Sequence, residues 1–404
     1  MNASGNFDSS PAPGKLSRVV IGVTGGIAAY KAAELVRLLV KDGVVVDVIL
    51  TEAGARFVTA TTFQALSGRP VLTDLWQSGA DNAMGHIAIS RGADAIIVAP
   101  ATADFISKLA HGAADDLLST LCLARECPLL LAPAMNRQMW WNSATQRNVA
   151  QLVADGIAIL GPDTGELACN ENGEGRMLEA TEIHAAIVAA RQPKVLAGKR
   201  VLMTAGPTFE AIDPVRGITN SSSGKMGFAI ARAAAEAGAA VTMVAGPTSL
   251  VTPAGVTRID VTSTAQMAEA VMAHVAEADI FIAVAAAADY TPANVSNQKI
   301  KKASDPLTIK LVPTTDILAT VAGRRNAPFC VGFAAESQDV AKLAEEKWRR
   351  KRVPLIVANL AQDALGSDVN EVILVDDAGT HPLPRLPKLE LARRLVGEIA
   401  TRLK

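Results

Sequence analysis

The sequence is poor in aromatic residues and in cysteine. Its 404 residues include 4 Trp, 2 Tyr, 9 Phe and 4 Cys. The cysteines, at positions 122, 127, 169 and 330, form no CxxC pair and have no histidine at metal-ligand spacing. Neither a disulfide framework nor a cysteine-based zinc site is therefore indicated. Any cysteine with a chemical role is therefore expected to act alone.

The sequence also lacks a charge imbalance and a long hydrophobic run. It has 39 Lys and Arg against 40 Asp and Glu, so no overall field attracts nucleic acid or anionic lipid. The longest apolar run, 280–288, is far too short to span a membrane. Residues 1–17 lack the basic start and apolar stretch of a signal peptide. We expect a cytoplasmic protein with no nucleic-acid and no membrane partner.

Small residues and chain length indicate the class of fold. A composition that is 50% hydrophobic, with 30 Gly and 20 Pro, is typical of α/β proteins whose helices pack closely on a sheet. A chain of 404 residues is too long for one ordinary core. A strand, turn and helix pattern begins near residue 18 and restarts near residue 198. We expect a disordered tail over 1–17, a first domain over 18–190, a linker over 191–199 and a second domain over 200–404.

Both domains are predicted to contain parallel sheets, because strands alternate with helical stretches. The expected strands of the first domain are 18–22, 44–50, 93–99 and 128–132. Those of the second are 200–204, 241–245, 280–285, 329–333, 355–358 and 371–375, with helices over 226–237 and 340–352. In the second domain the long segment 205–225 separates the first strand from its helix. Insertions at such a switch point are where ligands usually bind.

Two glycine-, alanine- and threonine-rich turns follow strands of the first domain. Gly25 and Gly26 lie between a strand and a helix, where backbone N–H groups form a ready anion site. Residues 100–104, Pro-Ala-Thr-Ala-Asp, follow another strand and add a hydroxyl and further amides. Each turn alone is equally consistent with a simple tight connection. Together, at one edge of the sheet, they suit a phosphate-bearing cofactor.

Three further residues of the first domain are candidates for chemistry. His86, beside the flexible Gly85, can act as an acid or base, although a structural histidine is the competing interpretation. Asn136 offers a carbonyl and an amide to a substrate, although it can simply form a turn. Cys169 lies in a glycine- and acid-rich stretch that predicts a mobile loop. An exposed loop thiol is unlike the usual buried cysteine and favours a chemical role.

These residues lie in motifs that resemble the phosphopantothenoylcysteine decarboxylases of the flavin-containing cysteine decarboxylase family, over residues 18–185. The motifs are Gly-Gly-Ile-Ala-Ala-Tyr-Lys (25–31), Gly-His-Ile (85–87), Pro-Ala-Thr-Ala-Asp (100–104), Pro-Ala-Met-Asn (133–136) and Gly-Arg-Met (175–177). The resemblance implies a Rossmann-like three-layer flavoprotein domain that binds FMN at the interface of a trimer. The FMN contacts that it implies are Gly25, Gly26, Ile27, Thr51, Pro100, Ala101 and Thr102.

The same resemblance implies the roles of three residues. In this family FMN oxidises the cysteine thiol of the substrate, carbon dioxide leaves the resulting thioaldehyde, and the enethiol is then reduced. His86 would be the base of the oxidative phase, Asn136 would hold the acylcysteine, and Cys169 would donate the proton of the final reduction.

In the second domain, residues 213–227 are rich in hydroxyl groups and glycine immediately before a helix. Such a loop can cap the helix and bind an anion at once. The spacing of its glycines to Lys225 does not fit a Walker A loop, so another nucleotide geometry is needed. A serine-rich capped loop without a ligand is the alternative.

Charged residues that suit a metal-bound triphosphate follow this loop. Asp289 comes after a strand, and Lys299 opens a Lys-Ile-Lys-Lys cluster. Lys347 and Lys351 are four residues apart, so they share one helical face and can reach one polyphosphate. A solvated turn and ordinary surface charges are the alternatives. These residues leave the choice between CTP and ATP open.

Here the chain resembles the phosphopantothenate–cysteine ligases, over residues 198–400. The motifs are Ala-Gly-Pro-Thr (205–208), Asp-Pro-Val-Arg (213–216), Ser-Ser-Gly-Lys-Met-Gly (222–227), Ala-Asp-Tyr (288–290), Lys-Ile-Lys-Lys (299–302) and Gly-Phe-Ala-Ala-Glu (332–336). The resemblance implies that CTP with Mg²⁺ activates the carboxylate of phosphopantothenate as an acyl-cytidylate, which the amine of cysteine attacks. Asn220 would contact this intermediate, Lys299 would stabilise it, and Asp289 would hold the metal. The implied nucleotide contacts are Asp289, Lys299, Thr315, Asp316, Ile317, Leu318, Phe333, Lys347 and Lys351.

Together the two resemblances indicate the bifunctional coenzyme A biosynthesis proteins. They imply a homo-oligomer built from decarboxylase trimers, assembled as a dodecamer, and from ligase dimers. An NAD-linked oxidoreductase is the main alternative, but neither glycine turn gives GxGxxG with an acid closing the second strand. A non-catalytic flavin-binding subunit is a second alternative, and the presence of both His86 and Cys169 argues against it.

Overall fold

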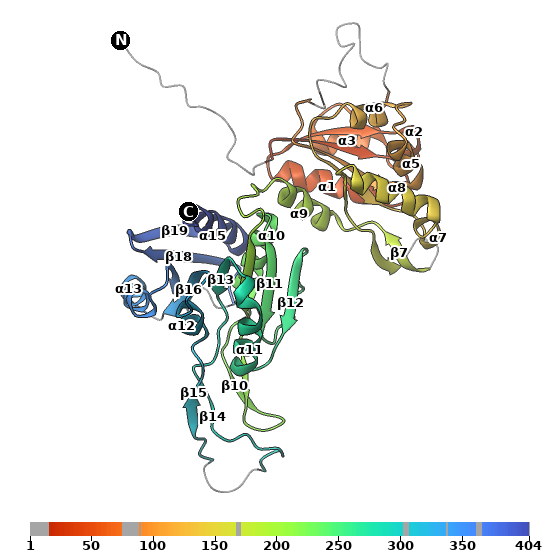
Figure 1. Cartoon of the computed structure of the whole chain (residues 1–404). Coiled ribbons are helices and arrows are strands. Elements are labelled where there is room, and N and C mark those ends of the chain that lie inside the picture. The colour runs from red at the N-terminus through yellow and green to blue at the C-terminus, as the bar shows by residue number, and fades with distance from the viewer. Residues whose placement is uncertain are drawn as a thin grey trace, which may run out of the picture. The chain divides into compact units, whose positions relative to one another are not determined.

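The structure is a computed structural model that describes residues 16–74, 89, 91–166, 171–301, 307–336, 338–360 and 366–403. The chain divides into two units, Met1–Gln192 and Pro193–Lys404, each with its own sheet (Figure 1). Both units are α/β, as the sequence predicts.

The first unit contains a five-stranded parallel sheet in the order β2-β1-β3-β4-β5. Its strands are β1 (Arg18–Val23), β2 (Val45–Leu50), β3 (Ala95–Ala101), β4 (Leu129–Pro133) and β5 (Ala158–Ile159). β3 and β4 are buried along their whole length. Strands that are covered on both faces have continuous hydrophobic sequences, so they can be predicted from the sequence.

Helices cover both faces of this sheet. On one face lie α1 (Ala29–Lys41), α3 (Ala60–Ser67) and α9 (Ala180–Ala190), whose apolar residues share a core with Val19 and Ile21 of β1. On the other lie α5 (Ala103–Ala110), α6 (Leu117–Leu123) and α8 (Ser143–Ala154), which share a core with Val20. The unit also has two short helices and an antiparallel hairpin: α2 (Glu52–Ala55), α7 (Arg137–Trp140), β6 (Asp163–Glu166) and β7 (Asn172–Arg176).

The beginning of this unit corrects one expectation. Leu16 is buried, and Ser17 donates hydrogen bonds from its backbone and its hydroxyl to Asp94. These two residues therefore belong to the packed unit and not to the disordered tail expected over 1–17.

The second unit contains an eight-stranded sheet in the order β12-β11-β8-β13-β16-β17-β18-β19. The strands are β8 (Arg200–Ala205), β11 (Ala240–Ala245), β12 (Val256–Asp260), β13 (Ile280–Ala283), β16 (Phe329–Glu336), β17 (Leu355–Leu360), β18 (Val369–Asp376) and β19 (Gly379–Pro387). The pairs from β12 to β17 are parallel, and the last two pairs are antiparallel. The sequence analysis predicted no strand at β12 or β19.

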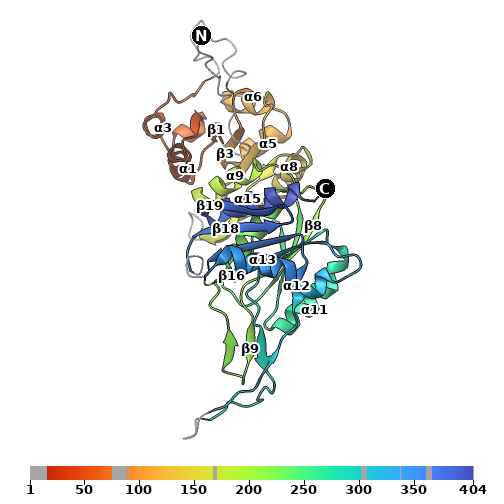
Figure 2. The same ribbon diagram turned by 90° about the vertical axis from the view of Figure 1, so that its left-hand side faces the viewer.

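Helices again cover both faces. α10 (Lys225–Glu236) and α15 (Lys388–Thr401) pack side by side on one face. α11 (Thr264–His274), the 3-10 turn η1 (Val275–Glu277), α12 (Ile317–Ala322) and α13 (Val340–Lys351) lie on the other (Figure 2). The three-layer arrangement that the resemblance implied is thus present in both units.

Two antiparallel hairpins extend away from the large sheet and form an arm of the second unit (Figures 1 and 2). One pairs β9 (Phe209–Ala211) with β10 (Gly217–Thr219), and the other pairs β14 (Tyr290–Pro292) with β15 (Leu311–Pro313). Both were absent from the prediction. The first hairpin lies inside the long segment between β8 and α10.

Each sheet has a point where the strand order reverses. In the first unit the chain runs from β1 to β2 on one side and then to β3 on the other, and in the second it runs from β8 to β11 and β12 and then to β13. The carboxyl ends of β1 and β3, and of β8 and β13, are therefore where ligand sites are expected.

Candidate functional sites

Hydrogen bonds join the two loops at the switch point of the first unit. The buried Thr24, which follows β1, donates from Oγ1 to the carbonyl of Pro100 (2.8 Å), and Thr102 N–H donates to Thr24 Oγ1 (3.0 Å). Thr102 also caps α5 by accepting Phe105 N–H. The glycine turn and the Pro-Ala-Thr turn thus form one continuous edge. β3 continues through Ala101, so Pro100 and Ala101 end the strand rather than follow it.

The glycine turn has the backbone that close approach of an anion requires. Gly25 and Gly26 have φ angles of 127° and 88°, which favour glycine, and they lead into the 13-residue helix α1. Among the described residues, and apart from its two neighbours in the chain, no atom lies within 4 Å of where a Cβ on Gly26 would be. Ile27 is 64% exposed beside this open space.

The ends of β2 and β4 extend the same edge. Thr51 N–H donates to the carbonyl of Val23 (3.1 Å), and the Thr51 hydroxyl caps α2. Ala134 N–H donates to the carbonyl of Ala101 (3.1 Å). Asn136 is exposed and caps α7 by accepting Met139 N–H at its Oδ1 (2.8 Å). The capping role expected of a turn-forming Asn is therefore present.

The base of the β6–β7 hairpin is fixed to this edge. Met135 N–H donates to the carbonyl of Gly175 (3.0 Å), directly before Asn136. Lys31 is buried, and its ammonium donates to the carbonyl of Met177 and to Glu179 (2.8 Å). This hydrogen bond, with another from Arg176, lowers the pKa of Glu179. His86 and Cys169 lie outside the described residues.

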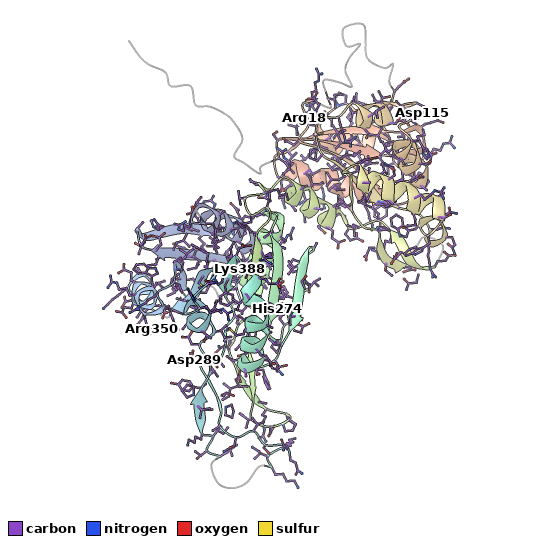
Figure 3. The ribbon with its side chains drawn as sticks, viewed as in Figure 1. Arg18, Asp115, His274, Asp289, Arg350 and Lys388 are labelled. Atoms are coloured by element: carbon purple, nitrogen blue, oxygen red, sulfur yellow. The ribbon has the colours of Figure 1, made fainter. Side chains whose placement is uncertain are left out.

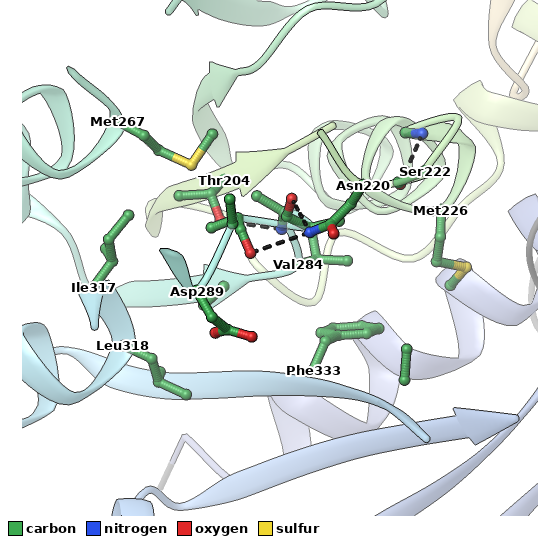
Figure 4. Close-up of a pocket in the computed structure, with 18 of the residues that line it drawn as sticks. Thr204, Asn220, Ser222, Met226, Met267, Val284, Asp289, Ile317, Leu318 and Phe333 are labelled. Atoms are coloured by element: carbon green, nitrogen blue, oxygen red, sulfur yellow. Dashed lines mark hydrogen bonds between the residues drawn. The ribbon is translucent and has the colours of Figure 1, made fainter. Parts of the chain in front are cut away.

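The second unit contains a cavity of about 830 Å³ at its switch point (Figure 4). Its walls come from the ends of β8, β13, β16 and β17, from the serine loop before α10 and from the start of α12. This volume is in the range of small-molecule sites. The predicted site residues that line it are Asn220, Asp289, Thr315, Asp316, Ile317, Leu318, Phe333, Lys347 and Lys351.

Asn220 holds the serine loop against the loop after β13. Its Nδ2 donates to the carbonyls of Ala286 (2.9 Å) and Ala287 (3.2 Å), as Figure 4 shows. Because both donors are engaged there, the side-chain oxygen is left as the acceptor that it can offer to a ligand. Ser222 Oγ accepts Gly224 N–H at the start of α10. The N-cap residue of α10, Gly224, makes no side-chain capping bond, so the prediction that this loop caps the helix was wrong.

Two lysines of α13 bring positive charge to the opposite wall. Lys347 donates to the carbonyl of Phe333 (2.7 Å), and Lys351 pairs with Asp316, which itself caps α12. Burial lowers the pKa of both lysines, and the nearby Asp289 carboxylate partly offsets the effect. Each ammonium has three donors, so both retain donors for an anionic ligand.

Asp289 and Lys299 differ in their relation to the cavity. Asp289 lines it, close to the point where the β14–β15 arm leaves the main part of the unit (Figure 3). Lys299 is exposed on the segment between β14 and β15 and is not among the lining residues. The structure thus brings together all the predicted second-domain site residues except Lys299.

The sequence analysis missed a buried polar network behind the cavity wall. Glu210 accepts hydrogen bonds from the backbone and the hydroxyl of Thr264, both 2.8 Å. Thr264 in turn contacts Thr208, whose hydroxyl accepts Ala288 N–H (2.9 Å). The network fixes the alanine-rich loop that Asn220 touches. Sequence gives no signal for it, since Thr264 lies 54 positions from Glu210 and 56 from Thr208.

Three polar residues at the far end of the cavity were also missed. Asn359, Asn370 and Lys388 line it from β17, β18 and the first position of α15.

Among the described residues no group of three or more His, Cys, Asp or Glu side chains could hold a metal ion. In the same residues, no helix has the length and apolar character of a membrane span.

The fold and the two edge sites define a two-unit α/β protein with a flavoprotein unit. Residues 9–192 match the Flavoprotein family, and residues 196–403 match the family described as DNA/pantothenate metabolism flavoprotein C-terminal domain.

Similar proteins cover nearly the whole chain. The coenzyme A biosynthesis bifunctional protein CoaBC of Vibrio cholerae is 51% identical over 93% of this chain and 96% of its own length. The CoaBC proteins of Escherichia coli K12 (48% identical, 95% and 97% coverage) and Bacillus subtilis (44%, 95% and 96%) are also similar. The chain belongs to this family of coenzyme A biosynthesis bifunctional proteins.

Proposed function

We propose that the second unit ligates phosphopantothenate to cysteine with CTP, and that the first unit then decarboxylates the phosphopantothenoylcysteine to phosphopantetheine with FMN. The observation that carries the proposal is the 830 Å³ cavity, which collects Asn220, Asp289 and two lysines at one switch point in a member of this family.

In the ligation, the cavity residues bind and orient the reactants. Lys347, Lys351 and the N-terminus of α10 offer positive charge and N–H donors to the phosphates of CTP. Asp289 is a single carboxylate, which suits Mg²⁺ because that ion usually takes one or two carboxylates together with phosphate oxygens. Asn220 contacts the acyl-cytidylate through its free carbonyl oxygen, and Lys299 contacts the nucleotide and stabilises this intermediate.

In the decarboxylation, the donor-rich edge of the first unit fits the phosphate of FMN. Gly25 and Gly26 would hold it with their backbone N–H groups, and the hydroxyls of Thr51 and Thr102 lie at the ends of β2 and β3, the two strands that flank β1. When bound, FMN supplies the oxidation and reduction of the substrate. Asn136 orients the acylcysteine, His86 takes a proton, and Cys169 returns one.

We further propose that the protein is a cytoplasmic homo-oligomer of decarboxylase trimers, arranged as a dodecamer, and ligase dimers. Ile27 and Tyr30 at the start of α1 are 64% and 60% exposed next to the FMN edge. Large exposed apolar side chains beside a site are typical of an interface. Mass measurement in solution, with Tyr30→Glu as the variant, tests the trimer.

The experiment is reconstitution with purified full-length protein. We expect a yellow protein with flavin absorbance that makes phosphopantetheine from phosphopantothenate, cysteine and CTP, and makes less with ATP. Asn220→Ala should abolish ligation and leave decarboxylation of supplied phosphopantothenoylcysteine intact. A colourless protein that releases no carbon dioxide would contradict the first activity, and loss of both activities in Asn220→Ala would contradict separate sites.

A further inference from the structure

Asp213, outside the cavity, accepts more hydrogen bonds than any other carboxylate among the described residues of the arm. Its side chain is 0% exposed and accepts five hydrogen bonds. Oδ1 accepts the backbone N–H groups of Val215 and Arg216, both 2.8 Å. Oδ2 accepts two bonds from the Arg216 guanidinium and one from Ile300 N–H (3.1 Å).

The two oxygens serve different connections. Oδ1 closes the turn of the β9–β10 hairpin, which is a local role that many aspartates have. Oδ2 joins this turn to a segment 87 positions further along the chain. Arg216 completes the junction by donating to the carbonyl of Ile300 (2.5 Å), and Ser296 N–H donates to the carbonyl of Ile212 (3.0 Å).

The electrostatics fit a permanent carboxylate. Burial alone would raise the pKa of Asp213, but the bonds from Arg216 and from the three backbone N–H groups outweigh burial and hold the pKa well below its ordinary value. Asp213 is therefore charged at every pH at which the enzyme is expected to work.

The junction connects the segments that carry two residues of the proposed ligation: Lys299, which lies outside the cavity, and Asn220, which lines it. Ile300 directly follows Lys299, and β10 (Gly217–Thr219) ends directly before Asn220. We propose that Asp213 is a positioning residue that holds the Lys299 segment to the strand leading to Asn220, so that Lys299 can reach the nucleotide. This inference rests on the proposed ligation.

Asp213→Asn is a selective perturbation of this junction. The Asn carbonyl can replace Oδ1 in the hairpin turn, whereas its NH₂ group would face the donors of Arg216 and Ile300, which then lose their acceptor. Asp260→Asn is the matched control, because Asp260 is an exposed aspartate of the same unit that pairs with Arg258 (2.7 Å) away from the cavity.

The experiment compares wild type, Asp213→Asn, Lys299→Ala, the double variant and Asp260→Asn in full-length protein. Ligation, CTP dissociation constant and decarboxylation are measured for each. We expect Asp213→Asn to weaken CTP binding and ligation at least tenfold, the double variant to bind CTP no more weakly than Lys299→Ala, and decarboxylation and Asp260→Asn to stay at wild-type values. A loss of active protein would lower the rate without changing the dissociation constant.

The outcomes separate the two hypotheses. If Lys299→Ala ligates and binds CTP normally, the proposed role of Lys299 fails. If Lys299→Ala is impaired but Asp213→Asn is normal, or if the two losses in CTP affinity add in the double variant, the positioning role of Asp213 is overturned. If Asp213→Asn loses decarboxylation and also unfolds at a lower midpoint temperature, the positioning role is likewise overturned, since Asp213 would then act on folding.

Discussion

Replacement of Lys347 by Met should weaken CTP binding specifically. The ammonium of Lys347 lies on the cavity wall and uses one donor on the carbonyl of Phe333, so two donors remain for the nucleotide. Met keeps much of the length and apolar volume of the lysine stem, so α13 should pack as before. The variant thus removes charge and donors with little change in shape.

The magnitude follows from the loss of one charged hydrogen bond. Such bonds contribute about 1.5–3 kcal/mol, which corresponds to a roughly 10- to 150-fold increase in the dissociation constant of CTP. Isothermal titration of full-length protein with CTP measures it. Lys342→Met is the control, because Lys342 is exposed on the same helix and does not line the cavity.

Two results would refute this reasoning. The expected increase in the dissociation constant is at least about tenfold. If the value for Lys347→Met instead stays within about threefold of wild type, Lys347 only supports the carbonyl of Phe333. An equal loss in Lys342→Met would mean that binding responds to the overall charge of α13. Decarboxylation serves as the internal check on folding and should not change in either variant.

CTP affinity should fall as pH rises through the pKa of Lys347, which burial lowers from its ordinary value of 10.5, because the neutral amine cannot attract phosphate; Lys347→Met should show a smaller fall. Burial raises the pKa of Cys122 to about 12 and of Cys330 to about 11, so iodoacetamide at about pH 8 should label neither before unfolding, as mass spectrometry can check. Gly175→Ala should lower decarboxylation at least tenfold and spare ligation, because Gly175 has φ of 138° and its Cβ would meet the carbonyl of Met135 beside Asn136; Gly112→Ala, with φ of 68° and open space, should have the smaller effect on carbon dioxide release.

Parallel strands and their ends were predictable because they are encoded locally. β3 and β4 are buried on both faces, so their continuous hydrophobic runs identify them and the turns that follow. The residues placed after these strands, including Thr102 and Asn136, do lie along one edge. The same holds for Asp289 after β13 and Phe333 in β16.

Edge strands and hairpins were missed for physical reasons. β19 contains Pro382, Pro384 and Pro387, which in sequence argue against a strand, yet it lies at the edge of the sheet, where a missing N–H donor is tolerated. The hairpin strands are only three residues long: β9, β10, β14 and β15. Such short segments show no clear strand pattern in the sequence, because their pairing depends on the other strand of each hairpin in the arm. The Glu210 network depends on contacts between distant segments, so residue spacing could not reveal it.

Because Lys299 lies outside the cavity, it could act in the cavity of its own chain or in that of another copy. The structure favours the cavity of its own chain. Oδ2 of Asp213 and the guanidinium of Arg216 fix the backbone next to Lys299, and only four residues of chain, about 13 Å when extended, lead from Arg216 to Asn220. If the chain is an oligomer, co-expression of Asn220→Ala with Lys299→Ala under two affinity tags should give a mixed oligomer with no more ligation than the Asn220→Ala and Lys299→Ala homo-oligomers. Were Lys299 to act on a neighbouring copy, the mixed oligomer would contain sites with both wild-type residues and would regain a measurable part of wild-type ligation. Recovery of activity would therefore contradict the proposed role of Asp213. The junction would then hold Lys299 near Asn220 of its own chain, whereas Lys299 would act in the cavity of another copy.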